Sequence, residues 1–160
     1  MKAKKGIKIK SAGIMIAPEV FEVKEKIYLP DGHVVVEGSK YFSWPTAQSI
    51  LAAKGAPSGW RMPTLAEAES IRDYYSKGRP KTPIFELGGF IAPGDMVVYK
   101  YMPKDAVKLI DRLGQLGCYW TSGLHDSLYP YVLANIGGNI WTGKYFYLQY
   151  GLQMLLVKDL

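Results

Sequence analysis

The spacing of apolar residues divides the chain into a β-rich start, a helical stretch and a β-rich second half. Residues 6–10 alternate lysine with isoleucine, which favours a strand. Two further apolar runs, 27–29 and 33–36, are joined by Pro-Asp-Gly at residues 30–32. An Asp-Gly pair between apolar runs favours a hairpin, because glycine adopts the positive φ that such turns need. The sequence therefore predicts an N-terminal β hairpin extension within residues 1–40.

A first short helix is predicted to begin after Ser43, whose side chain is a candidate N-cap. Trp44, Ala47 and Leu51 then fall on one face at helical spacing, and Gly55 is placed to end the helix. The expected element is a short amphipathic helix that buries this face.

A second helix is predicted from a capping box at Thr64 and Glu67. In this motif the threonine hydroxyl accepts a hydrogen bond from the amide of residue 67, and the glutamate carboxylate accepts one from the amide of residue 64. The residues expected on the buried face are Leu65, Ala68, Ile71 and Tyr75.

The apolar pattern after residue 84 is mostly that of strands and turns, with a third helix predicted at residues 103–113. The end of the chain is predicted to form a β meander with strands at 119–121, 131–136, 139–141, 145–148 and 154–157. The predicted fold class is α+β, with two short helices early and a β-rich C-terminal half packed as one globular unit.

Length and composition agree with a single globular domain. The chain has 160 residues, of which 48% are hydrophobic and 21% charged, and a chain of this length buries most of its apolar surface on folding. No apolar run approaches the roughly 18 residues that a membrane span requires. The single cysteine, Cys118, excludes an intrachain disulfide and a cysteine-rich metal site.

The positive charge is concentrated at the N-terminus. Five lysines and no acid occur in the first ten residues, whereas the rest of the chain carries 15 basic and 14 acidic residues. We interpret this basic arm as a solvated tail or a lysine-fringed edge strand rather than a surface for nucleic acid or anionic lipid. The apolar piece at residues 12–17 is too short for a secretory signal.

Two distant segments are interpreted as architecture: residues 57–64, Pro-Ser-Gly-Trp-Arg-Met-Pro-Thr, and residues 117–122, Gly-Cys-Tyr-Trp-Thr-Ser. The indole of the first is expected in the core, and its guanidinium is expected to bind loop carbonyls or a carboxylate. Since successive strand side chains point to opposite faces, one of the two adjacent aromatic residues in the second must face inward. The residues assigned to this structural motif are Trp60, Arg61, Pro63, Thr64, Glu67, Tyr119 and Trp120.

The order of these segments resembles the Fibrobacter succinogenes major paralogous domain. The resemblance covers about residues 41–160 and includes Leu-Gly-Gly-Phe at 87–90 and a Met-Leu-Leu-Val-Lys-Asp ending at 154–159. That family is similar to C-type lectin-like folds and, more distantly, to formylglycine-generating enzymes. The resemblance implies a C-type lectin-like domain at 41–160, outside which residues 1–40 form the N-terminal β extension. It also implies a fold that displays loops for ligand recognition.

No residue set in the chain is favoured as a catalytic centre. Ser122, His125, Asp126 and Ser127 include the residue types of a hydrolase triad, but neighbours in one short loop rarely converge as a triad requires. A polar turn is the favoured interpretation. Cys118 is interpreted as a buried small hydrophobe, because the local sequence lacks the cations that activate a thiolate.

Metal binding is not expected either. After Cys118 the only acids are Asp126 and Asp159, too few for the six to eight oxygen ligands that Ca²⁺ takes. The only histidines are His33 and His125, which does not favour zinc. We therefore predict a calcium-independent protein without a cofactor.

Aromatic residues gather between positions 119 and 150, among serine, glycine and asparagine. Strand alternation cannot bury them all, since a core-facing Phe146 would leave the tyrosines on both sides of it exposed. This composition is typical of recognition surfaces, while exposed tyrosines also suit antiparallel strands, and both interpretations stay open. The predicted ligand contacts are Tyr131, Asn135, Asn139, Trp141, Lys144, Tyr145 and Tyr147.

The leading hypothesis is a non-catalytic recognition domain of bacterial or phage origin that binds a protein, peptide or glycan. The alternative is a structural or assembly module of a cell surface or phage particle, in which residues 1–38 mediate a homo-oligomer. A relative of the formylglycine-generating enzymes is the third hypothesis. We expect no nucleic-acid partner, no membrane span, and production in the cytoplasm or in a phage particle.

Overall fold

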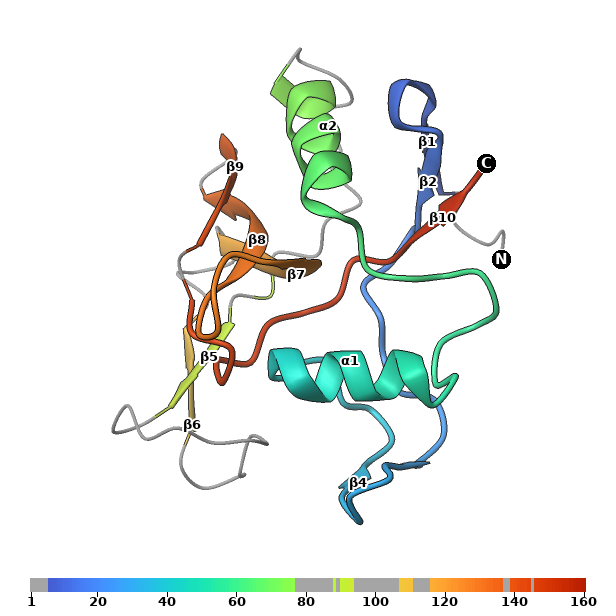
Figure 1. Ribbon diagram of the computed structural model, residues 1–160, viewed down its shortest axis with the longest axis vertical. Helices are drawn as coiled ribbons and strands as arrows, with labels where there is room; N and C mark the ends of the chain where they lie inside the picture. The colour runs from blue at the N-terminus through green and yellow to red at the C-terminus, as the bar shows by residue number, and fades with distance from the viewer. Residues whose placement is uncertain are drawn as a thin grey trace.

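The computed structural model describes residues 6–76, 88, 90–93, 107–110, 116–136, 139–144 and 146–160. Their two α-helices and ten strands form an α+β protein with four antiparallel sheets (Figure 1), which confirms the predicted fold class. Among these residues, no helix is long and apolar enough to cross a membrane. The finer assignment to a C-type lectin-like fold stays a prediction.

The N-terminal strands are joined to the end of the chain. Strand β1 (Ile7–Ile9) pairs with β2 (Ile14–Ile16), and β2 pairs on its other side with β10 (Val157–Asp159), so these strands lie side by side in Figure 1. A 3-10 turn, η1 (Lys10–Ala12), is closed by Gly13, whose φ is +66°. The extension therefore shares a sheet with the last strand instead of standing apart.

The second hairpin forms where the Asp-Gly pair predicts it. Strand β3 (Ile27–Tyr28) pairs with β4 (Val34–Val35). Gly32 has a φ of +91°, and the Asp31 carboxylate accepts a hydrogen bond from the amide of His33 at 3.0 Å.

Helix α1 (Trp44–Ala52) begins as predicted and ends differently. The Ser43 hydroxyl accepts a hydrogen bond from the amide of Thr46. At the other end Lys54, not Gly55, takes the left-handed conformation, with φ +59°. A Cβ on Gly55 would lie 2.7 Å from Ile27 Cδ1 and 2.8 Å from Ile50 Cγ2. Gly55 is therefore required for close packing, and a lysine carries the backbone conformation that glycine prefers.

Substitutions at these two neighbours are expected to act in opposite directions. Lys54→Gly should raise the free energy of unfolding by about 0.5–1 kcal/mol, because it removes the steric cost of a left-handed lysine. Gly55→Ala should lower it by about 1–2 kcal/mol, because the added methyl overpacks a closed site. Urea denaturation of both variants measures the two changes. Equal effects of the same sign would contradict this account.

Helix α2 (Leu65–Ser76) has the predicted capping box. The Thr64 amide donates to the Glu67 carboxylate at 2.9 Å, and the Glu67 amide donates to the Thr64 hydroxyl at 3.2 Å. Ala68 and Ile71 are fully buried, so this face packs against the sheet beside it.

That sheet consists of β7 (Leu116–Leu124), β8 (Pro130–Ile136) and β9 (Asn139–Gly143), in this order. Both of its faces are covered, because Tyr119 packs with Ile71 in one core cluster while Trp120 packs with Phe42 in another. Both aromatic side chains are therefore buried, whereas strand alternation against a single core predicts that only one of them is.

Three elements of the sequence prediction are corrected. Residues 107–110, inside the predicted third helix, form strand β6 (Val107–Ile110) paired with β5 (Phe90–Pro93), and the rest of 103–113 lies outside the described residues. Val107 and Ile110 are β-branched, which suits a paired strand. Residues 146–148, predicted as part of a strand at 145–148, lie instead in a bend and a turn. The Tyr150 amide closes this turn by donating to the carbonyl of Tyr147. The last strand, predicted at 154–157, is β10 and begins only at Val157.

Candidate functional site

The segment around Arg61 is tied to the end of the chain by backbone and side-chain contacts. The backbone of Arg61 exchanges two hydrogen bonds with Val157, which brings its side chain to the end of β10. The guanidinium donates to both carboxylate oxygens of Glu67, at 2.6 and 2.8 Å, and to Asp159 at 2.8 Å. These contacts raise the pKa of Arg61, and the hydrogen bond from Arg61 lowers the pKa of Glu67. The predicted carboxylate partner is thus confirmed.

Trp60 is only partly in the core where the sequence placed it. Its indole packs against the core cluster with part of the ring exposed. The ammonium of Lys158 lies 5.1 Å from the ring centroid, a cation–π distance.

Cys118 is buried in β7, and burial raises the pKa of its thiol to about 12. We expect native Cys118 to react with iodoacetamide at about pH 8 at least a hundredfold more slowly than the urea-unfolded chain. The reason is that the thiolate is the reactive form and the raised pKa lowers its fraction in the native protein. Mass spectrometry of timed samples measures both rates. Rapid labelling of the native protein would favour the enzyme hypothesis instead.

The polar turn after β7 does not assemble a triad. Asp126 accepts hydrogen bonds from the amides of Leu128 and Tyr129, at 2.8 and 3.0 Å, and these bonds lower its pKa. His125 instead contacts the Tyr131 hydroxyl through Nδ1 and Lys144 Nζ through Nε2, each at 2.8 Å. Asp126 thus shapes the turn, and His125 is directed to Tyr131 and Lys144.

Aromatic rings gather beside this turn. The Tyr129 and Tyr147 ring centroids are 4.6 Å apart at an interplanar angle of 30°, and their hydrogen bond raises the pKa of Tyr129. The Leu148 amide donates to the Leu128 carbonyl at 3.0 Å, which holds the two segments together. We call this region the tyrosine surface; it consists of His125, Leu128, Tyr129, Tyr131, Lys144 and Tyr147.

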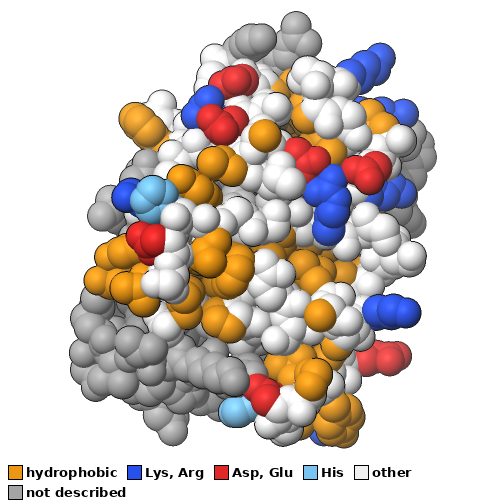
Figure 2. All heavy atoms as spheres, viewed as in Figure 1, with side chains coloured by type: hydrophobic (Ala, Val, Ile, Leu, Met, Phe, Trp, Pro, Cys, Tyr) orange, Lys and Arg blue, Asp and Glu red, His pale blue; other side chains and the backbone are white. Residues whose placement is uncertain are grey.

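The tyrosine surface is accessible. Leu128 is 46% exposed, although it is a large apolar residue. Figure 2 shows hydrophobic side chains gathered on the flank where β7, β8 and β9 lie, with histidine, lysine and acidic side chains beside them. Such a mixture of rings and polar groups suits ligand recognition.

The predicted contacts are divided by the structure. Tyr131, Lys144 and Tyr147 meet at the tyrosine surface, while Asn139 and Trp141 are exposed on β9. Tyr145 lies outside the described residues.

The prediction that Asn135 contacts a ligand is corrected by the structure. This residue is only 4% exposed, because it lies in β8, the middle strand, where it pairs with Gly117 on one side and Ile140 on the other. A ligand at the surface cannot contact it.

Sequence reasoning missed His125, Leu128 and Tyr129 as members of the tyrosine surface. The available signal was the Asp126 side chain, since aspartate binds backbone amides two residues on and so forms tight turns. A tight turn between β7 and β8 brings both its flanks toward the same end of the sheet.

No three His, Cys, Asp or Glu side chains come together as a candidate metal site within the described ranges. Comparison with known proteins found no family model, curated protein or solved structure that matches this chain.

Proposed function

We propose that this chain is a non-catalytic recognition domain that binds a protein, peptide or glycan through the tyrosine surface. One observation carries the proposal: Tyr131, Lys144 and Tyr147, which come from separate segments, gather around one turn together with an exposed leucine. Because strands and backbone hydrogen bonds hold the segments, the contact groups are positioned before a ligand arrives, which lowers the entropic cost of binding.

Each group on the surface has a role that its chemistry supports. The adjacent Tyr129 and Tyr147 rings, tilted by 30° to each other, offer apolar area with hydroxyl groups at low conformational cost. Lys144 and His125 supply polar contacts beside them. Trp141, which is 51% exposed, offers a further anchor on β9. A C-type lectin-like fold and a bacterial or phage origin remain part of this proposal.

A screen on glycan and peptide arrays identifies a ligand, and substitutions then place its site. Tyr147→Ala should weaken binding about tenfold, as loss of a hot-spot ring does. The matched control is Tyr28→Ala, since Tyr28 is 72% exposed and lies on β3. Unchanged affinity in Tyr147→Ala and in Trp141→Ala would show that the ligand binds elsewhere.

An assembly module is the second candidate, and the edge of β1 favours it. β1 is the outer strand of the sheet β1-β2-β10 and has one strand neighbour among the described residues, and such an edge is a template for a strand of a second copy. Sedimentation at increasing protein concentration tests this candidate. A strict monomer throughout would remove it.

A further inference from the structure

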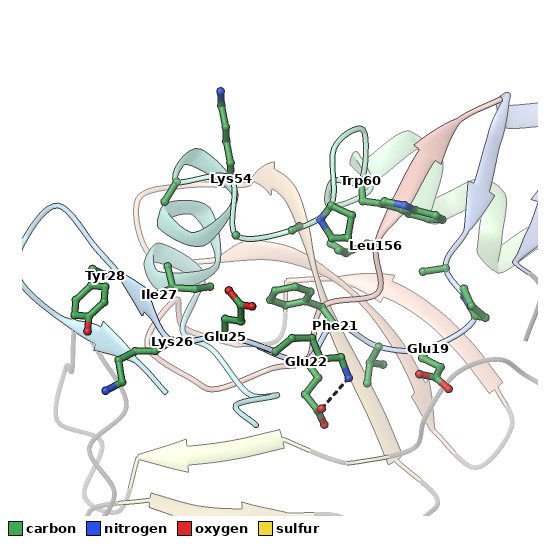
Figure 3. Close-up of a pocket in the computed structure, with 18 residues that line it drawn as sticks. Glu19, Phe21, Glu22, Glu25, Lys26, Ile27, Tyr28, Lys54, Trp60 and Leu156 are labelled. Carbon is green, nitrogen blue, oxygen red and sulfur yellow. Dashed lines mark hydrogen bonds and ion pairs between the residues drawn. The ribbon is translucent and has the colours of Figure 1, made fainter. Parts of the chain in front are cut away.

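A groove of about 850 Å³ lies between residues 17–28 of the extension and residues 53–60 after α1. Its volume is within the range of small-molecule sites. Figure 3 shows Phe21, Ile27, Trp60 and Leu156 around it. The groove is therefore an apolar site at the junction of two parts of the chain that are distant in sequence.

Backbone contacts hold the groove open. The amides of Ala17 and Phe21 donate to the carbonyls of Leu156 and Met154, at 2.9 and 2.8 Å, which fixes the extension against the body. The opposite wall is closed by a turn in which the Trp60 amide donates to the Pro57 carbonyl at 3.1 Å. These contacts keep both walls in place without a ligand.

The groove is lined by three acidic and three basic residues, and one of its carboxylates is available to a cation. Glu22 is already neutralised by Lys24 at 3.0 Å and by Lys40 at 3.7 Å. Glu25 makes no hydrogen bond or ion pair in the described part of the chain, and Figure 3 shows its carboxylate between Ile27 and Phe21.

The other free charges point elsewhere. Figure 3 shows that the side chains of Lys26 and Lys54 extend away from the groove. A positive group in the groove would therefore meet the Glu25 carboxylate.

Aromatic side chains line the groove. The Lys158 ammonium lies 5.1 Å from the centroid of the Trp60 ring, and the ring lines the groove as apolar contact area. Phe21 presents the floor and packs on Phe42 with ring centroids 5.9 Å apart.

We propose that this groove binds a small organic cation, an ammonium or guanidinium group carried on an apolar body. The apolar body packs on Phe21, Ile27 and Trp60, and the cationic group pairs with the carboxylate of Glu25. This site is separate from the tyrosine surface, and the two proposals stand independently.

The test uses the full chain and three probes of similar size: protonated 2-phenylethylamine, neutral 2-phenylethanol and anionic 3-phenylpropanoate. Titration followed by amide chemical shifts in NMR should show saturable changes at the groove with the amine. The alcohol should bind about fivefold more weakly, as expected for loss of one solvent-exposed charge pair, and the anion more weakly still.

Substitutions locate the charge. Glu25→Gln should weaken amine binding about fivefold. Glu37→Gln, which removes an exposed carboxylate that does not line the groove, should leave it unchanged, as should Tyr147→Ala. Equal binding of amine and alcohol, full affinity in Glu25→Gln, or no groove shifts at about 20 mM amine would each overturn the proposal.

Discussion

Replacing Trp120 with alanine is expected to lower the free energy of unfolding by about 3–5 kcal/mol. The Trp120 side chain is fully buried, and its Nε1 donates to the Phe42 carbonyl at 2.6 Å. The substitution removes the packed ring and leaves a cavity between the sheet and α1. Urea denaturation at neutral pH measures the loss.

Two further variants separate the causes of this loss. Trp120→Phe keeps a ring but no donor, and should lower the free energy of unfolding by about 1–2 kcal/mol. The Phe42 carbonyl still accepts from the Leu152 amide at 3.0 Å, which limits the cost. Trp141→Ala, at an exposed site, should change it by about 0.5 kcal/mol or less. A similar loss in Trp120→Ala and Trp141→Ala would contradict the buried role.

Arg61→Met is expected to lower the free energy of unfolding by about 2–3 kcal/mol, because it leaves the half-buried Glu67 carboxylate without its partner. The Glu67 side chain is 15% exposed, whereas that of Asp159 is 81% exposed. Asp159→Asn, the control on the solvent side of the same guanidinium, should therefore cost about 0.5 kcal/mol or less.

The same pair predicts a pH dependence. The hydrogen bond from Arg61 lowers the pKa of Glu67 in the folded state below its ordinary value of 4.5. The stabilisation is therefore fully present above this ordinary pKa and is lost as the pH falls through the folded pKa. In Arg61→Met this part of the acid destabilisation should disappear. An equal loss of unfolding free energy between neutral and acid pH in Arg61→Met and in the unsubstituted protein would contradict the assignment.

Local signals predicted the elements that local chemistry controls. Ser43, Thr64 and the Asp31-Gly32 pair each act on backbone groups within a few residues, so their sequence is enough to place two helix starts and a hairpin. Residues 107–110 show the limit of this reasoning, because a short apolar run adopts a strand or a helix according to its partner. The partner, β5, is set by tertiary structure.

The site was partly predictable for the same reason. Tyrosine enrichment pointed to Tyr131 and Tyr147, but the assembly of the tyrosine surface depends on the long-range contact between Leu128 and Leu148. The burial of Asn135 follows from its place in the middle strand. The groove had no signal in the sequence, because its walls meet only after the extension has been attached to the body.

The pairing of β2 with β10 has a consequence for folding during synthesis. Strand β2 is complete early, yet its neighbour is made of residues 157–159. Contacts between such distant positions form slowly, because a long loop must close first. On the ribosome, strand β2 of the nascent chain therefore lacks its β10 neighbour until residues 157–159 have been translated. The backbone contacts of residues 17 and 21 with residues 156 and 154, which fix one wall of the groove, form equally late.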